Sequence, residues 1–244
     1  MKMKRIYVLL ILTLIINQIG ISQPNIQGFI DSGNQNLKNR NFKDAMTEFA
    51  KALKEQPADT AALGGIIKAS LLSDDLKEAQ KHIDNAIKTY PTNAEFLFRK
   101  GILNNKKGDF DKAIEDFNDA LKLNGTNSIK VQIYLNLGAS QLKLESFDSA
   151  LDSYKKALDL SPRNPSIYNY KGYANYKLGN FSEAINDFNN AIDLDPNNAA
   201  SYYNRGMAYL KTAEKAKACA DFHKSCKLEN INACKMIMTE CKTK

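Results

Sequence analysis

Residues 172–196, GYANYKLGNFSEAINDFNNAIDLDP, contain the pattern that decides the fold of this chain. Gly172 is followed twelve residues later by Ala184, and then by Phe188, Ala191 and a proline. The same order of residue types recurs along the chain about every 34 residues. A period of this length is typical of a stack of two-helix units, in which each unit packs on its neighbours instead of around one central core.

Six copies of the pattern can be aligned. The alanine twelve positions after the glycine is present in all six, and an aromatic residue or isoleucine follows four positions later. The other copies are Gly33, Ala45, Phe49, Ala52 and Pro57; Ile67, Ala79, Ile83, Ala86 and Pro91; Gly101, Ala113, Phe117 and Ala120; Gly138, Ala150, Tyr154, Ala157 and Pro162; and Gly206, Ala218 and Phe222. Small residues let two antiparallel helices cross closely, while the large residue fills the gap to the next unit.

The pattern resembles the tetratricopeptide repeat family, over roughly residues 26–232. This resemblance implies an all-α fold: a right-handed superhelix of six helix-turn-helix repeats, followed here by a C-terminal capping helix. We expect the repeats at residues 26–59, 60–93, 94–130, 131–164, 165–198 and 199–230, the last one degenerate, and the cap at 231–244. Three extra residues within 124–130 predict a longer turn between the third and fourth repeats.

Short polar residues mark the expected helix starts, where their side chains can accept hydrogen bonds from free backbone N–H groups. Those before the second helices are Asn41, Asp75, Asp109, Ser146 and Asn180, and those before the first helices are Asp59, Asn93, Asn164 and Asn198.

The first 22 residues read as a secretory signal peptide. Lys2, Lys4 and Arg5 precede an apolar run at residues 6–16, and Gly20 and Ser22 supply the small residues of a cleavage site. The run is shorter than the ~20 residues of a spanning helix, so we expect no membrane span after cleavage. We therefore expect an exported protein, periplasmic in the first place and extracellular in the second.

Composition excludes several function classes. Without the leader the chain has 31 basic and 27 acidic side chains, interspersed in every repeat, which does not favour nucleic acid binding. Neither histidine, His82 or His223, has a nucleophile or a carboxylate pair at a recognisable catalytic spacing. We therefore expect no enzymatic activity, no cofactor and no small-molecule substrate.

All four cysteines lie near the C-terminus. Cys226 and Cys234, and likewise Cys219 and Cys241, are symmetric about residue 230, where Asn230 marks a turn. Residues equidistant from the turn of an antiparallel helical hairpin face each other, which favours the disulfides Cys226–Cys234 and Cys219–Cys241. Buried free thiols, and a metal site that includes His223, are the alternatives.

The family resemblance implies that first helices line a concave groove that binds peptides. Transferred by spacing, the groove positions are Phe98, Asn105, Leu135, Asn169, Tyr173, Tyr176, Lys177, Tyr203 and Met207, with Leu142 and Lys143 in the fourth repeat. Two interpretations of the tyrosines stay open, because aromatic residues at helical spacing either contact a partner or pack between neighbouring first helices.

The sequence thus predicts a non-catalytic scaffold that binds another protein or peptide. Self-association of copies of the chain through the open ends of the stack is one alternative. A redox- or metal-responsive module built on the cysteines is the other.

Overall fold

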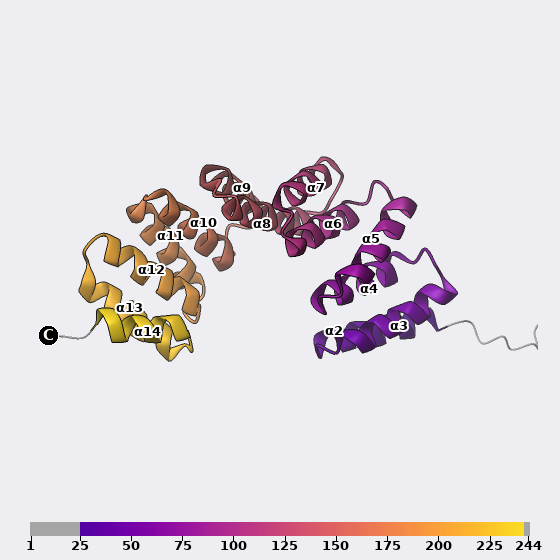
Figure 1. The fold of residues 1–244 in the computed structure, drawn as a ribbon, viewed down its shortest axis with the longest axis horizontal. Coiled ribbons are helices and arrows are strands. Elements are labelled where there is room, and N and C mark those ends of the chain that lie inside the picture. The colour runs from indigo at the N-terminus through magenta and orange to yellow at the C-terminus, as the bar shows by residue number, and fades with distance from the viewer. Residues whose placement is uncertain (1–24, 242–244) are drawn as a thin grey trace, which may run out of the picture. The chain divides into compact units, whose positions relative to one another are not determined.

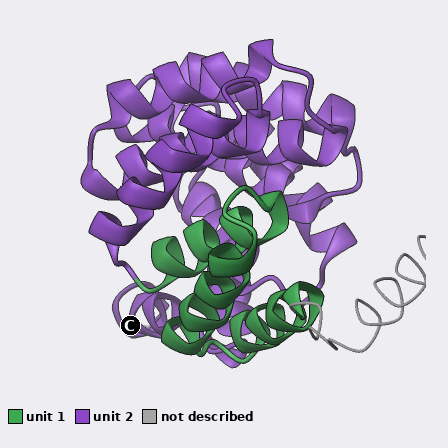
Figure 2. Cartoon of the chain, turned by 90° about the vertical axis from the view of Figure 1, so that its right-hand side faces the viewer, with its two compact units in different colours: residues 1–73 green, residues 74–244 purple. Residues whose placement is uncertain are grey.

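The computed structural model describes residues 25–241, and these form thirteen α-helices and no strand (Figure 1). The expected all-α fold is therefore confirmed for these residues. None of the described helices is long and apolar enough to cross a membrane. The chain divides between Ser73 and Asp74 into two compact units (Figure 2). The expected signal peptide, residues 1–22, lies outside the described residues.

The first unit contains the helices α2 (Ile26–Lys38), α3 (Phe42–Glu55) and α4 (Thr60–Leu72). Phe49 of α3 is fully buried, and glycines of both other helices face its ring. A Cβ atom added to Gly33 of α2 would lie 2.7 Å from the ring, and one added to Gly65 of α4 would lie 2.4 Å from it. The helices approach the ring this closely because neither glycine has a side chain.

The second unit begins with α5 (Leu76–Thr89), followed by four helix pairs and one last helix. The pairs are α6 (Ala94–Lys107) with α7 (Phe110–Lys122), α8 (Asn127–Lys143) with α9 (Phe147–Leu160), α10 (Pro165–Leu178) with α11 (Phe181–Leu194), and α12 (Ala199–Lys211) with α13 (Lys215–Lys227). In each pair a glycine of the first helix faces the aromatic ring of the second, and an added Cβ would lie 2.4 to 2.8 Å from that ring. The facing residues are Gly101 and Phe117, Gly138 and Tyr154, Gly172 and Phe188, and Gly206 and Phe222.

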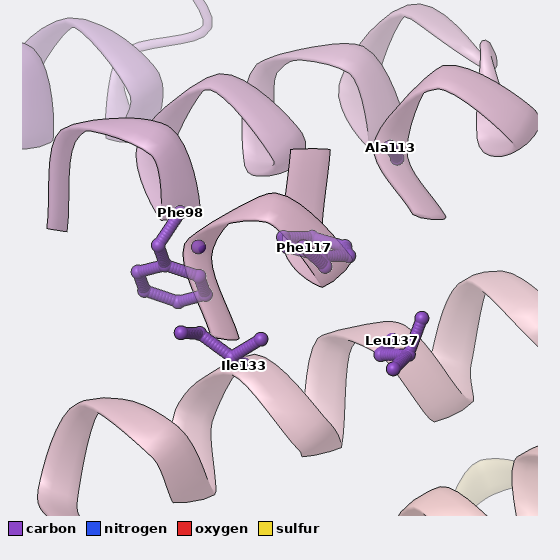
Figure 3. Packing of buried hydrophobic residues seen from close by; sticks show 6 residues of the cluster. Phe98, Ala113, Phe117, Ile133 and Leu137 are labelled. Carbon is purple, nitrogen blue, oxygen red and sulfur yellow. The ribbon is translucent and has the colours of Figure 1, made fainter. Parts of the chain in front are cut away.

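The aromatic residue of one repeat also packs on the first helix of the next. In Figure 3, Ile133 and Leu137 of α8 point toward Phe98 and Phe117, and all four side chains are buried. Phe98 is only 1% exposed, and its ring centroid lies 5.9 Å from that of Phe117. The prediction that Phe98 lines the groove was therefore wrong, because this position faces the core.

Buried aspartates join the two helices of three repeats. Asp116 of α7 accepts hydrogen bonds from Lys100 Nζ at 2.7 Å and from Asn104 Nδ2 at 2.6 Å, both on α6. The equivalent residue of α11 is Asp187, which accepts hydrogen bonds from Lys171 and Asn175 of α10. The equivalent residue of α13 is Asp221, which accepts from Arg205 of α12. Because a buried carboxylate is costly without partners, these bonds fix the register of each helix pair.

The polar residues at the helix starts behave in two ways. All four expected caps of first helices accept a backbone N–H: Asp59, Asn93, Asn164 and Asn198. Among the expected caps of second helices only Asp75 does so, and Asn41, Asp109, Ser146 and Asn180 make no such bond. The ψ angles of these four residues are 66° to 68°.

The junction of the third and fourth repeats also differs from the expectation. Helix α7 ends at Lys122 and α8 begins at Asn127, so the connection has the same length as that between Glu55 and Thr60. The extra residues extend α8, which has 17 residues. The boundary expected at 130/131 therefore falls inside a helix, because Thr126 caps α8 with its side chain at Ile129 N.

The last helix, α14 (Ile231–Glu240), packs on α13 and closes this end of the second unit. Disulfides join Cys219 to Cys241, with Cα atoms 5.6 Å apart, and Cys226 to Cys234, with Cα atoms 4.8 Å apart. These are the pairs that the spacing about residue 230 predicts. They leave no free cysteine among the described residues for the thiol or metal alternatives.

We predict that Gly101→Ala lowers the melting temperature by several degrees. The new Cβ would lie 2.4 Å from the Phe117 ring, and such overpacking costs about 1–3 kcal/mol. Gly125→Ala is the control, since its Cβ would meet nothing closer than 3.4 Å. Thermal melts followed by circular dichroism compare the two variants. Equal melting temperatures would mean that the close approach of α6 to Phe117 is not required.

We predict that the double variant Cys219→Ser with Cys241→Ser frays α14 and leaves α8 and α10 protected. The lost bond closes a loop with a sequence separation of 22 residues, and opening such a loop costs about 3 kcal/mol in the chain-entropy model. Repeat units depend mainly on their neighbours, so amide hydrogen exchange should quicken only at the C-terminal end. The control is Cys226→Ser with Cys234→Ser, whose separation is 8 and whose effect should be smaller. Faster exchange spread evenly over the second unit would contradict this account.

Candidate functional site

The first helices of the last three repeats form two adjoining pockets in the second unit. The larger pocket, of about 370 Å³, lies over α8 and α10, with Tyr154 of α9 among its lining residues. The smaller pocket, of about 220 Å³, lies between α10 and α12. Tyr173 and Asn204 line both pockets, which makes them one continuous surface. We call this surface the tyrosine groove; its residues are Ala139, Leu142, Lys143, Tyr154, Asn169, Tyr170, Tyr173, Tyr176, Tyr203, Asn204 and Met207.

Stacked rings form much of the groove. The rings of Tyr173 and Tyr176 lie one helical turn apart on α10, with centroids separated by 6.5 Å and planes inclined by 21°. The ring of Tyr170 stacks on that of Tyr154, with centroids 5.8 Å apart. Tyr170 and Tyr173 are the exposed members, at 44% and 38%. Burial raises the pKa of Tyr176, so its hydroxyl stays protonated at neutral pH and can donate a hydrogen bond.

A hydrogen-bond cluster holds α10 against α12 beneath this surface. Asn169 Oδ1 accepts from Ser201 Oγ at 3.2 Å and from Asn204 Nδ2 at 3.1 Å. Both acceptor positions of the Asn169 carbonyl are therefore used. The cluster fixes the distance between the two helices that form the smaller pocket.

The groove contains most of the predicted binding residues. Asn169, Tyr173, Tyr176, Tyr203 and Met207 line it, as do Leu142 and Lys143. The two interpretations of the tyrosines apply to different residues. Tyr173 is exposed, whereas Tyr203 is half-buried, with its ring 6.0 Å from that of Phe222 in the core.

The remaining predicted residues lie elsewhere. Besides Phe98, which is in the core, Asn105 accepts a hydrogen bond from Ser140 Oγ at 2.7 Å and so links α6 to α8. Leu135 packs against the buried cluster around Tyr154. Lys177 is exposed, with its Nζ 5.3 Å from the centre of the Phe147 ring. None of these side chains lines either pocket.

Sequence reasoning missed Tyr154, Tyr170 and Asn204 as groove residues. Tyr154 occupies the aromatic position of the repeat, where the pattern predicts only packing. A signal was present, because this position is phenylalanine or isoleucine in the other five copies. Tyr170 and Asn204 lie one residue away from the positions transferred by spacing, and only the structure shows that they reach the surface.

The chemistry of the groove suits recognition. Lys143 is its one charged residue, and its other polar groups are phenol hydroxyls and carboxamides. Among the described residues no group of three or more His, Cys, Asp or Glu side chains is placed to hold a metal ion. The groove therefore offers contact area and hydrogen bonds to a bound group.

Family comparisons match most of the chain. One model, described as TPR repeat, matches residues 142–179 and 172–212, and three models described as tetratricopeptide repeat match residues 36–97, 94–127 and 199–232. Among curated proteins, the photosystem I assembly protein Ycf3 of Prochlorococcus marinus is 29% identical over 79 residues, which is 32% of this chain and 46% of Ycf3. The matches to curated relatives cover 23% to 58% of the relatives' own length.

Solved structures show the same fold. The pilF protein of Pseudomonas aeruginosa superposes with a TM-score of 0.75 at 18% identity, over 88% of this chain and 97% of that one. YrrB, described as a TPR protein with an unusual peptide-binding site, superposes with a TM-score of 0.60 at 22% identity, over 76% of this chain and 94% of that one. At these identities the likeness concerns the fold alone.

Proposed function

This chain belongs to the tetratricopeptide repeat family, and we propose that it is a non-catalytic scaffold whose tyrosine groove binds a segment of another protein. The observation that carries the proposal is the pair of adjoining pockets on the first helices of three consecutive repeats. The first helix of each of these repeats contributes residues to one extended surface. Such a surface suits an extended peptide segment better than a compact small molecule.

The residues of the groove support this role. Tyrosine side chains on rigid helices offer a large apolar area and a polar tip, and they lose little conformational freedom on binding. Tyr173 stands at the junction of both pockets and is 38% exposed, so one side chain can contact a partner in each. The peptide-binding site that the description of YrrB names, and the assembly role that the name of Ycf3 gives, agree with a scaffold of this kind.

We propose further that the protein acts outside the cytoplasm, in the periplasm or, as the second choice, in the extracellular space. The support is the signal-peptide pattern of residues 1–22 together with the two C-terminal disulfides. Disulfides persist in oxidising compartments and are rare in the cytosol.

Self-association is the second candidate function, and one observation favours it. Ile231 and Met238 of α14 are 71% and 60% exposed, although both are large and apolar. A second copy of the chain that covered them would bury this area. In that case the C-terminal end, and not the groove, would be the functional surface.

We predict that Tyr173→Ala weakens capture of the partner at least tenfold. A tyrosine that becomes buried at the centre of an interface when the partner binds contributes about 2 kcal/mol or more to the binding free energy. Quantitative retention from an extract of the native compartment measures the loss. The side chain is exposed, so the melting temperature should stay near that of the wild type. Ile231→Ser with Met238→Ser is the matched control and should retain the partner.

The same two variants separate the candidate functions. If the control variant loses dimers in light scattering while Tyr173→Ala retains every partner, self-association through α14 replaces the groove as the function.

We predict that the exported form begins at Gln23. Signal peptidases cleave after small residues, which Gly20 and Ser22 supply at the required positions. N-terminal sequencing of protein isolated from its own compartment checks this. An intact Met1 on membrane-bound protein would contradict both the cleavage and the proposed location.

A further inference from the structure

Tyr154 carries a hydroxyl that the fold does not use. The equivalent position is Phe49, Ile83, Phe117, Phe188 or Phe222 in the other repeats, and each of these packs without a polar atom. The Tyr154 side chain is 0% exposed, and its hydroxyl has no hydrogen-bond partner among the described residues. Since an unpaired buried hydroxyl costs free energy, phenylalanine would fold this repeat at least as well.

The residue that carries the unused hydroxyl lines the larger pocket of the tyrosine groove. Tyr154 lies in that lining beneath Tyr170, and the rings of the two tyrosines stack on each other. Burial raises the pKa of Tyr154 far above its ordinary value, so the phenol stays protonated and can donate. Less than 1 Å² of the hydroxyl oxygen is accessible, so a bound group accepts a hydrogen bond from it only by displacing the ring of Tyr170.

Other donors surround the same pocket. The carbonyl oxygen of Asn169 already accepts two hydrogen bonds, which leaves its amide nitrogen to donate. Lys143 lines the pocket, is exposed, and makes no ion pair with any described residue. No carboxylate is among the lining residues. Three residues that carry donor groups, one of them cationic, thus line one pocket of about 370 Å³.

We infer that this pocket binds the carboxylate of a glutamate or aspartate side chain in the bound peptide. The hydroxyl of Tyr154 and the amide of Asn169 donate to its oxygens, and Lys143 supplies the opposite charge. Leu142 and the Tyr170 ring contact the methylene groups of the ligand side chain. The inference rests on the proposed function, since it names the residue that the tyrosine groove selects.

Peptide libraries with one fixed residue test the inference. The probes are acetylated, amidated 13-residue peptides, degenerate except for a central Glu, Gln, Leu or Lys, and the readout is the amount retained on the immobilised protein. We expect the Glu library to be retained several-fold above the Leu and Lys libraries. Tyr154→Phe should lower retention of the Glu library about tenfold and leave the Leu library unchanged, because a hydrogen bond to a charged group is among the strong ones.

Two further variants act as controls. Tyr168→Phe removes a hydroxyl on α10 outside the groove and should change nothing. Lys143→Met should weaken retention of the Glu library more than that of the Gln library, since only the former carries a charge. Tyr154→Phe should melt at or above the wild-type temperature, and a lower melting temperature would mean that the hydroxyl is structural and would overturn the inference.

The remaining outcomes are distinct. Equal retention of the Glu library by wild type and Tyr154→Phe overturns the inference while the proposed function stands. Retention of Glu and Gln alike, lost in Tyr154→Phe, replaces the carboxylate by a neutral acceptor. Displacement of the Glu library by an equal concentration of N-acetylglutamate amide assigns the pocket to a small free carboxylate. No retention of any library overturns the proposed function as well.

Discussion

The close approach of a glycine to a buried aromatic ring is the constraint on which the rest of the second unit depends. An added Cβ would stand 2.4 to 2.8 Å from the ring in each of the four pairs from α6 to α13, well inside van der Waals contact. The second helix of each pair can therefore sit at only one distance from the first. Because the same ring also touches the next first helix, as Phe117 does with α8, each repeat passes its geometry on to its neighbour. The spacing of α8, α10 and α12, and with it the tyrosine groove, follows from these contacts.

Most residues of the tyrosine groove take no part in the glycine–aromatic contacts that hold each helix pair together. Glycines and aromatic rings occupy the interface within each pair, joined in three pairs by a buried aspartate, whereas Tyr170 and Tyr173 of α10 remain exposed. Tyr154 is the exception, because it fills a scaffold position, carries a hydroxyl without a partner among the described residues, and also lines the pocket. A residue whose hydroxyl adds nothing to folding, at a site lined by donors, is best explained by what the pocket binds.

Much of the fold could be predicted from the sequence because the residues that fix the helix packing recur from repeat to repeat. Gly172, Ala184 and Phe188 recur with fixed spacing, so the helices and the caps of first helices were predictable one by one. The symmetry of the cysteines about Asn230 predicted the pairs that the structure contains, since a helical hairpin fixes which residues face each other.

Predictions failed where a local pattern allowed two geometries. Phe98 had the spacing of a groove residue, but a first helix turns some of its apolar positions toward the following ring. Four of the five polar residues before second helices make no capping hydrogen bond, although their residue types favour one. The extra residues near 127 continued a helix, because Thr126 could cap it earlier than the spacing implied. The groove itself was half predictable, since spacing locates a face of a helix but not the depth at which each side chain lies.

The central claim is that the surface around Tyr173 contacts another protein. A photo-crosslinking residue, benzoylphenylalanine, placed at position 173 in the native compartment tests it most directly, with the same residue at position 231 for comparison. The account predicts that light joins a different protein to position 173 and that mass spectrometry places the link in an extended segment next to an acidic residue. Crosslinks from position 173 only to a second copy of this chain, or partner crosslinks from position 231 alone, would contradict it.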